Sequence, residues 1–258
     1  MTSISRRDFL KLGGLSLLST AFLRFDPVGS TYQAQPVIYK GSTHHNHVAL
    51  TYDDCYLATM LRRLEDILEG HPDVHITLFP VGEALLTTEQ KEPGIWKRFH
   101  QNGHEIGYHS FDHTNPDVMS KEKVVADFDQ WRDALREVLK EEEPLVHFAR
   151  PPFGNTSESF LYMCAQRGLV PTMWSTGWGG DTETVVNYTV PKIQRGDIVL
   201  LHTRVEDMDT TEEALPELAA RGIKPVTLSR VYLDWLKEQN ESGGCYADSM
   251  SITRTCIE

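Results

Sequence analysis

The sequence predicts an α/β fold, namely a distorted (β/α) barrel of about seven strands in a single domain. Short apolar runs typical of buried parallel strands alternate with segments whose apolar residues recur at helical spacing. This alternation predicts parallel pairing through right-handed crossovers, with the helices outside the sheet. The number of strand candidates between residues 47 and 240 favours a small barrel over an open sheet.

The first half of the predicted barrel begins with a strand at residues 47–52, whose continuous apolar centre suits a buried parallel strand. Residues 57–68 repeat apolar side chains at helical spacing, and Gly70 ends this helix. The strand 74–79, the helix 95–101 and the strand 104–108 follow in the same pattern.

The second half contains a long amphipathic helix at residues 121–139, whose apolar residues fall on one side. A glycine-rich loop spans residues 175–181, and Ser229 is a candidate N-cap for the last helix. The remaining strands are 145–149, 170–174, 198–201 and 225–228, and the remaining helices are 158–167, 212–220 and 231–238.

The segment before the barrel is predicted to be an export signal at residues 1–30, followed by a linker at 31–46. Arg6 and Arg7 precede a modestly apolar run at 12–23, which is too short for a stable membrane span. The arrangement resembles a twin-arginine signal. The resemblance implies export by the twin-arginine machinery to the periplasm, cell wall or exterior, with no stable membrane span after processing.

Export places the four cysteines in a compartment that permits disulfides. Cys245 and Cys256 bracket a short polar segment of the C-terminal tail 241–258 and can close it as a loop, whereas Cys55 and Cys164 have no evident partner.

The chain is acidic, with 25 Lys and Arg against 37 Asp and Glu and a formal net charge of −12. An acidic chain lacks the basic patch that binds nucleic acid or anionic lipid. Its composition, 40% hydrophobic and 24% charged, is that of a globular protein. We therefore expect no nucleic-acid partner.

Polar side chains follow directly after several predicted strands. In a (β/α) barrel the carboxyl ends of the strands meet at one face, where active sites are built. We therefore expect these side chains to form one cluster. They are Asp53, Asp54, His109, His113, Arg150 and His202.

The expected cluster contains the donors of a metal site. His109 and His113 are four residues apart, so that on a helical turn both rings reach one point. One carboxylate of the Asp53 and Asp54 pair completes a facial triad with open positions, and the other is free to act on a proton. A divalent metal lowers the pKa of bound water and polarises a carbonyl, as hydrolysis of an amide or ester requires.

Other residues can complete a hydrolytic site. His202 is the candidate acid for a leaving group, and Arg150 can keep the free carboxylate ionised and oriented. Backbone N–H groups at Phe153 and Gly154 can stabilise an oxyanion. Each residue also has a structural interpretation: a helix cap for the aspartates, a surface position for the histidine pair, a turn for Arg150 and a core position for His202.

Four segments resemble, in order, motifs of the polysaccharide deacetylase family, carbohydrate esterase family 4. They are residues 51–55 (Thr-Tyr-Asp-Asp-Cys), 109–113 (His-Ser-Phe-Asp-His), 150–154 (Arg-Pro-Pro-Phe-Gly) and 200–202 (Leu-Leu-His). The resemblance spans about residues 46–236. It implies a distorted (β/α) barrel that removes acetyl groups from a sugar polymer with the help of a metal, usually zinc.

The resemblance also implies a role for each residue. It makes Asp53 the general base and His202 the general acid, with Arg150 orienting Asp53 and the Phe153 backbone lining the oxyanion site. It assigns the metal to Asp54, His109 and His113.

Two positions depart from the family's pattern. Cys55 stands where the first motif usually ends in Gly, and its thiol can alter the turn, ligate the metal or oxidise. The fourth motif, usually an Asp-rich segment ending in Asp-Trp, is here residues 174–182. Asp181 is the candidate to replace the family's Arg-tethering Asp, although the spacing differs by about one residue, and Trp178 can instead line the sugar site.

The predicted function is metal-dependent removal of N-acetyl groups from a cell-wall or extracellular glycan, such as peptidoglycan or a chitin-like N-acetylglucosamine polymer. Two alternatives remain open: an O-acetyl esterase on an acetylated polysaccharide such as xylan, and a catalytically impaired glycan-binding domain.

A histidine-rich tract at residues 41–47 can in principle bind metal. We favour a solvated approach to the first strand, because histidines on a mobile segment must be ordered before they bind anything.

Overall fold

The computed structural model describes residues 35–177 and 179–241. The predicted export signal, Trp178 and the tail with Cys245 and Cys256 lie outside the described residues. No helix in the described part of the chain is long and apolar enough to cross a membrane.

The strands pair in parallel around one central strand, β1 (His47–Asp54). β2 (Thr77–Pro80) and β7 (Ile198–His202) flank β1, β3 (Glu105–Ile106) pairs with β2, β6 (Thr176–Gly177) pairs with β7, and β8 (Lys224–Pro225) pairs with the start of β1. β4 (Phe148–Ala149) and β5 (Val170–Pro171) pair with each other, and a bridge between Tyr108 and Ala149 joins β4 to the segment after β3.

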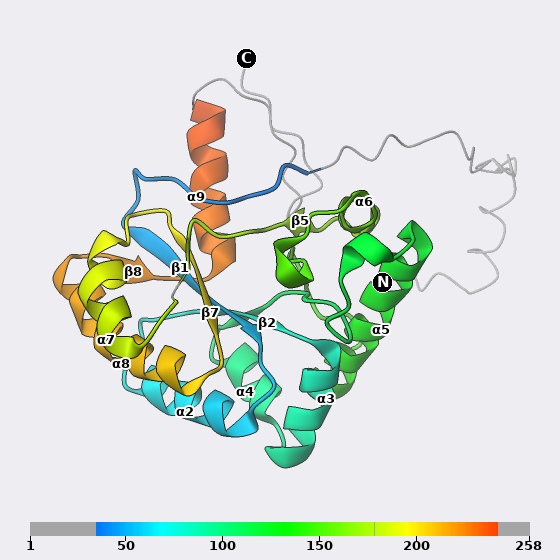
Figure 1. The fold of residues 1–258 in the computed structure, drawn as a ribbon, viewed down its shortest axis with the longest axis horizontal. Helices are drawn as coiled ribbons and strands as arrows, with labels where there is room; N and C mark the ends of the chain where they lie inside the picture. The colour runs from blue at the N-terminus through cyan, green and yellow to red at the C-terminus, as the bar shows by residue number, and fades with distance from the viewer. Residues whose placement is uncertain (1–34, 178, 242–258) are drawn as a thin grey trace, which may run out of the picture. The chain divides into compact units, whose positions relative to one another are not determined.

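Helices lie around these strands (Figure 1). They are α2 (Ala58–Glu69), α3 (Gly82–Lys91), α4 (Ile95–Gln101), α5 (Lys121–Leu139), α6 (Glu158–Arg167), α7 (Thr182–Thr184), α8 (Val205–Ala220) and α9 (Leu228–Glu241). Parallel strands inside and helices outside confirm the predicted α/β fold. The barrel is a distorted one, because β5 and β6 are not paired within the described residues and the sheet is not closed by hydrogen bonds.

Helix α5 shows how a sequence pattern becomes a packed layer. Its buried apolar residues, among them Phe128, Trp131 and Leu135, lie on one face, as their spacing predicts. The indole Nε1 of the fully buried Trp131 donates a hydrogen bond of 2.8 Å to the carbonyl of Pro80, at the end of β2. Burial of one such large side chain contributes about 1.5–3 kcal/mol to stability. The contact fixes α5 against the strand ends.

Several helices differ from the prediction, among them α3, α8 and α9. The sequence pattern does not predict α3, because few of its side chains are buried and its apolar period is weak. α8 begins at Val205 and not at residue 212. The prediction that Ser229 caps α9 is wrong: the helix begins at Leu228, and the Ser229 N–H and hydroxyl both donate to the carboxylate of Glu105.

A buried histidine just before β3 makes the fold sensitive to acid. His104 is 7% exposed, and its Nδ1 accepts a hydrogen bond of 3.3 Å from the Ile76 N–H, which requires an unprotonated nitrogen. Burial, and then the nearby His75 ring, lower the pKa of His104 from 6.5 to about 4. The unfolded chain therefore binds this proton at a higher pH than the folded chain, and stability is lost as the pH falls from 6.5 towards 4.

We expect His104→Asn to remove this loss, because an Asn side chain can keep the acceptor without titrating. The wild-type free energy of unfolding, relative to that of His104→Asn, should fall by about 2–3 kcal/mol between pH 7 and pH 4.5. Denaturant titrations of both proteins at the two pH values measure this difference. Asp127 and Asp207, whose pKa values burial raises to about 6, act in the opposite direction but are present in both proteins. A difference that does not change with pH would contradict the assignment to His104.

Candidate active site

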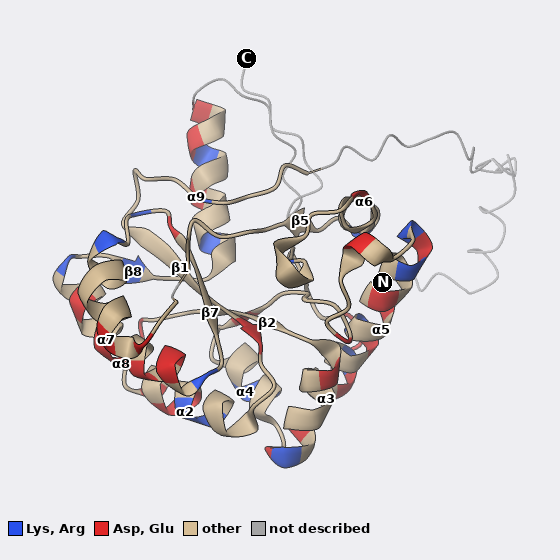
Figure 2. Ribbon diagram, viewed as in Figure 1, with Lys and Arg blue, Asp and Glu red and all other residues tan. Residues whose placement is uncertain are grey.

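The candidate active site lies at the carboxyl ends of the central strands. Asp53 and Asp54 end β1, His202 ends β7, and the register places Asp53 beside His202. Arg150 follows β4 directly, and His109 follows the residue that bridges to β4. Figure 2 shows acidic residues at this end of β1, whereas many others lie on the helices. The structure therefore brings together the strand-end side chains that the sequence predicts to meet.

Three of these side chains form a candidate metal site. Asp54 Oδ1 lies 3.4 Å from His109 Nε2 and 3.3 Å from His113 Nε2. One donor atom from each of the three residues lies within 4.8 Å of the others. Two imidazole nitrogens and one carboxylate oxygen are the donor set of sites that bind a divalent metal and leave coordination positions open.

A hydrogen bond sets the tautomer of His109. Its Nδ1 lies 2.9 Å from the carbonyl oxygen of Arg150, which can only accept, so Nδ1 carries the proton. The Nε2 lone pair is then directed towards Asp54 and is available to a metal. A backbone carbonyl that orients a ligating histidine in this way is a usual feature of metal sites.

Asp54 supports the same interpretation. Its Oδ1 is buried and has no hydrogen-bond partner of acceptable geometry within the described chain. Burial acts to raise the pKa of Asp54, but the neighbouring His109 and His113 lower that pKa well below its usual value. An ionised, buried oxygen without a hydrogen bond is costly unless a cation compensates it. The residues present therefore fit a divalent ion.

Strained backbone surrounds the site. A positive φ outside glycine costs about 1–3 kcal/mol and persists where the surrounding structure enforces it. In the described residues, five of the six non-glycine positions with positive φ are at the site: Asp54, Cys55, Ser110, His113 and Phe153. The sixth, Lys140, ends α5.

Cys55 takes this backbone conformation, with φ 64°, where the family usually has Gly. Its thiol is fully buried and donates to the carbonyl of Tyr52 at 3.6 Å. Burial raises the pKa of this thiol well above its usual value. Cys55 is not among the clustered donor atoms of the described residues, so its side chain belongs to the core side of the turn.

A residue that the sequence does not single out holds the histidine segment in place. The carboxylate of Asp127, on α5, accepts hydrogen bonds from the Tyr108 hydroxyl and, at 3.0 Å, from the Phe111 N–H. Burial raises the pKa of Asp127 to about 6. The sequence signal that could have identified Asp127 is an acidic residue on the apolar face of a predicted helix. The unpredicted helix α3 contributes as well, because the Gly82 N–H donates to the carbonyl of Ser110.

Arg150 fixes the second aspartate. It is fully buried, and its Nη1 donates 2.7 Å to Asp53 Oδ1 and 2.8 Å to the Thr51 hydroxyl. Its Nη2 donates 3.0 Å to the carbonyl of Met173, and its guanidinium lies 4.3 Å from the centre of the Phe79 ring. Asp53 Oδ1 is thereby occupied, whereas Oδ2 lies 3.8 Å from His109 Nε2 and faces the candidate metal site.

His202 and Phe153 border the same site. His202 is half-buried, and burial lowers its pKa even though the charges of Asp53 and Asp54 act to raise it. Phe153 is 65% exposed, and its ring packs edge-on against His113, with 4.6 Å between ring centres.

The structure does not bring Asp181 to Arg150. Asp181 is exposed and caps α7, where its carboxylate accepts a hydrogen bond of 2.8 Å from the Thr184 N–H. The Arg150 guanidinium is held instead by the groups described above. Trp174, from the same segment, is half-buried, with its ring 5.9 Å from that guanidinium.

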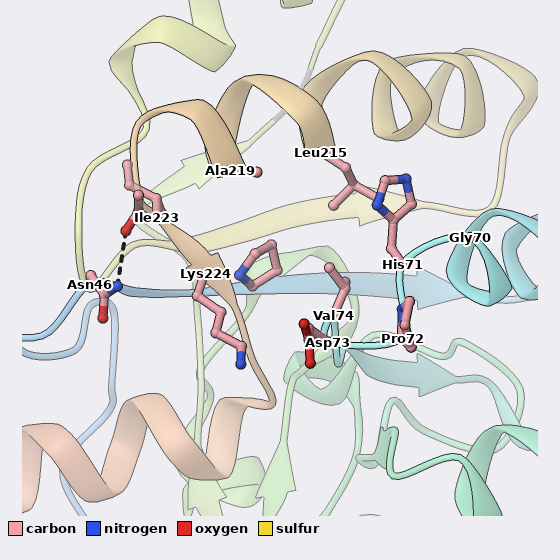
Figure 3. Close-up of a pocket in the computed structure, with 12 residues that line it drawn as sticks. Asn46, Gly70, His71, Pro72, Asp73, Val74, Leu215, Ala219, Ile223 and Lys224 are labelled. Carbon is pink, nitrogen blue, oxygen red and sulfur yellow. Dashed lines mark hydrogen bonds between the residues drawn. The ribbon is translucent and has the colours of Figure 1, made fainter.

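A hollow at the opposite ends of the strands is a different feature (Figure 3). It has a volume of about 420 Å³, and Asn46, Asp73 and Lys224 are among the residues that line it. Asn46 precedes β1 and Lys224 begins β8, so the hollow lies at the amino ends of these strands. Active sites of (β/α) barrels lie at the carboxyl ends, which excludes this hollow as the candidate active site.

Comparisons with known proteins identify the family of this chain. The polysaccharide deacetylase family model matches residues 40–171, slightly more than half of the chain. A peptidoglycan-N-acetylglucosamine deacetylase of Bacillus cereus is 30% identical over 196 residues, which cover 71% of this chain and 87% of the relative.

Solved structures share the fold. The Bc1960 peptidoglycan N-acetylglucosamine deacetylase superimposes with a TM-score of 0.67 at 24% identity, covering 76% of this chain and 92% of that protein. A carbohydrate esterase family 4 pseudoenzyme from Bacillus anthracis does so with a TM-score of 0.69 at 20% identity, covering 77% of this chain and 69% of that protein. These two likenesses show the fold alone. The family match and the 30% identity show more: this chain belongs to the polysaccharide deacetylase family and is a hydrolase that acts on carbon–nitrogen bonds.

Proposed function

We propose that this chain removes N-acetyl groups from N-acetylglucosamine residues of a cell-wall or extracellular glycan, peptidoglycan or a chitin-like polymer. The observation that carries the proposal is the juxtaposition of two units. The first is Asp53, which is paired with Arg150 and can accept a proton. The second is the donor set of Asp54, His109 and His113. Asp53 Oδ2 lies 3.8 Å from His109 Nε2. The peptidoglycan deacetylase among the relatives supports this substrate class.

In the proposed reaction, water adds to the acetyl carbonyl, the carbon–nitrogen bond breaks, and acetate and a free amine are formed. A divalent ion held by Asp54, His109 and His113, most simply zinc, would lower the pKa of water and polarise the carbonyl. Asp53 accepts the proton of the attacking water on Oδ2, because Arg150 holds Oδ1. The Phe153 backbone N–H is proposed to stabilise the oxyanion.

His202 is proposed to donate the proton that the departing amine needs. It lies beside Asp53 on the adjacent strand. A pKa below the usual value makes its imidazolium form a stronger acid towards the amine.

The proposed place of action is outside the cytoplasm. The twin-arginine-like segment at residues 1–30 supports export. A net charge of −12 argues against a nucleic-acid partner.

We expect His202→Ala to lower the rate of amide deacetylation by about 10²–10⁴-fold without loss of metal. The loss should be smaller on an activated acetyl ester, because its leaving group needs little protonation. Rates on both substrates, with metal analysis of each protein, check this. Equal losses on the amide and the ester would argue against His202 as the acid.

The function itself is tested by measuring acetate release from chitooligosaccharide, peptidoglycan and acetylxylan with the same metal-loaded protein. Release from the N-acetylated glycans supports the proposal. Release from acetylxylan alone would show an O-acetyl esterase instead. Glycan binding without release from any substrate would show an impaired domain.

A further inference from the structure

A second group of metal-binding side chains lies at the amino end of β1. His45 precedes the strand, His47 is its first residue, and Asp234 comes from α9. One donor atom from each lies within 4.8 Å of the other two. Asp54 is at the far end of the same strand, about 23 Å away at the rise of an extended chain. The two groups are therefore separate.

The histidine segment is held by the body of the protein. The Gly41 N–H donates 2.7 Å to the carbonyl of Gly196, whose own N–H donates 2.7 Å to the carbonyl of His47. The Lys224 N–H donates 2.8 Å to the carbonyl of Asn46. Folding has therefore already ordered the main chain that carries the histidines, and the entropic argument against metal binding by a mobile tract does not apply.

The side chains are arranged around one buried carboxylate. His47 Nδ1 lies 2.5 Å from Asp234 Oδ2, and His45 Nε2 lies 3.9 Å from Asp234 Oδ1. The two imidazole rings are parallel within 3°, with centres 6.0 Å apart. The Asp234 side chain is 2% exposed, and its Oδ1 makes no hydrogen bond within the described chain. Such an oxygen is costly to bury unless a cation meets it.

Further donors and one competitor stand beside these residues. Glu238 follows Asp234 by one helical turn on the same face of α9, and its Oε1 lies 3.7 Å from His44 Nδ1. Arg230 Nε lies 3.2 Å from Asp234 Oδ1, without the geometry of a hydrogen bond, and the Arg230 side chain is 48% exposed. A metal at this position would have to compete with that charge.

We propose that His45, His47 and Asp234 bind a second divalent transition-metal ion, with zinc the best match. Two imidazoles and a carboxylate suit zinc better than calcium or magnesium, which prefer oxygen donors. Three protein ligands leave a fourth position for water. The ion would clamp α9 to the start of β1.

The first test counts bound zinc. After equilibrium dialysis against zinc and removal of free metal, the wild-type chain should hold two ions, His45→Gln/His47→Gln one, and Asp54→Ala one. Elemental analysis gives the count, and circular dichroism checks that each variant is folded. No zinc in folded Asp54→Ala, or two ions retained in His45→Gln/His47→Gln, would overturn the proposal.

The second test uses the competitor. Arg230→Gln removes one positive charge beside the site and should tighten zinc binding by about fivefold or more, measured by calorimetry in the Asp54→Ala background. Lys237→Gln, a loss of charge elsewhere on α9, serves as the control. If His45, His47 and Asp234 form only an ion-pair cluster, Asp54→Ala will bind no zinc, and Arg230→Gln will not change that.

Discussion

Replacement of Asp53 by Asn is expected to lower kcat/KM for acetate release by about 10²–10⁴-fold while the protein keeps its metal. Asn has nearly the shape of Asp, and its side-chain oxygen can still accept from Arg150 Nη1, which donates 2.7 Å to Asp53 Oδ1. What the variant loses is the basic Oδ2 that faces His109. Initial rates on an N-acetylglucosamine oligomer and metal analysis of the same sample check the two halves of this expectation.

Asp181→Asn is the matched control, since it makes the same chemical change at an exposed residue whose carboxylate accepts from the Thr184 N–H. We expect its rate to stay within about twofold of the wild type, because the Asn side-chain oxygen can still accept from the Thr184 N–H and no catalytic group is lost. A fully active Asp53→Asn enzyme would refute the general-base assignment. An inactive, folded Asp181→Asn enzyme would return that residue to the site.

Substitution of any proposed metal ligand should remove both metal and activity. Asp54→Ala, His109→Ala and His113→Ala each delete one of the three donors that lie together in the described part of the chain, and two remaining ligands hold a divalent ion much less tightly than three. We expect deacetylation to fall at least about 10³-fold, because water activation and carbonyl polarisation are lost together. The zinc content of each variant, measured in the His45→Gln/His47→Gln background, isolates this site from the second one.

His71→Ala, a histidine at the opposite ends of the strands, is the control for these ligand substitutions. It should keep both metal and rate. Unchanged zinc content in Asp54→Ala, His109→Ala or His113→Ala would show that the ligand assignment is wrong, whatever happens to the rate.

Local pattern was sufficient for the strands that build the site. The apolar run before Asp53 ends two residues before the end of β1, and the one before His202 ends one residue before the end of β7. In a parallel α/β fold this places the following polar side chains on one face, so their meeting follows from the strand ends alone. The ordered motifs added the roles, which no periodicity supplies.

Features that depend on contacts between distant segments could not be predicted in the same way. His47 and Asp234 are 187 residues apart, and nothing local to either one indicates the other. The Asp127 carboxylate is recognisable as unusual on an apolar helix face, but its partners Tyr108 and Phe111 are fixed only by the packing of α5. Asp181 was assigned by analogy, whereas the local geometry of Thr184 determines where its carboxylate lies.

The central claim is that the donor set at the end of β1 carries a metal needed for deacetylation. The most direct measurement is a zinc titration of metal-free His45→Gln/His47→Gln protein, followed by acetate release from an N-acetylglucosamine oligomer. We expect the rate to be at background without metal, to rise linearly, and to level off at one zinc per chain. Full activity in the metal-free protein, or no acetate at any zinc loading, would contradict the claim.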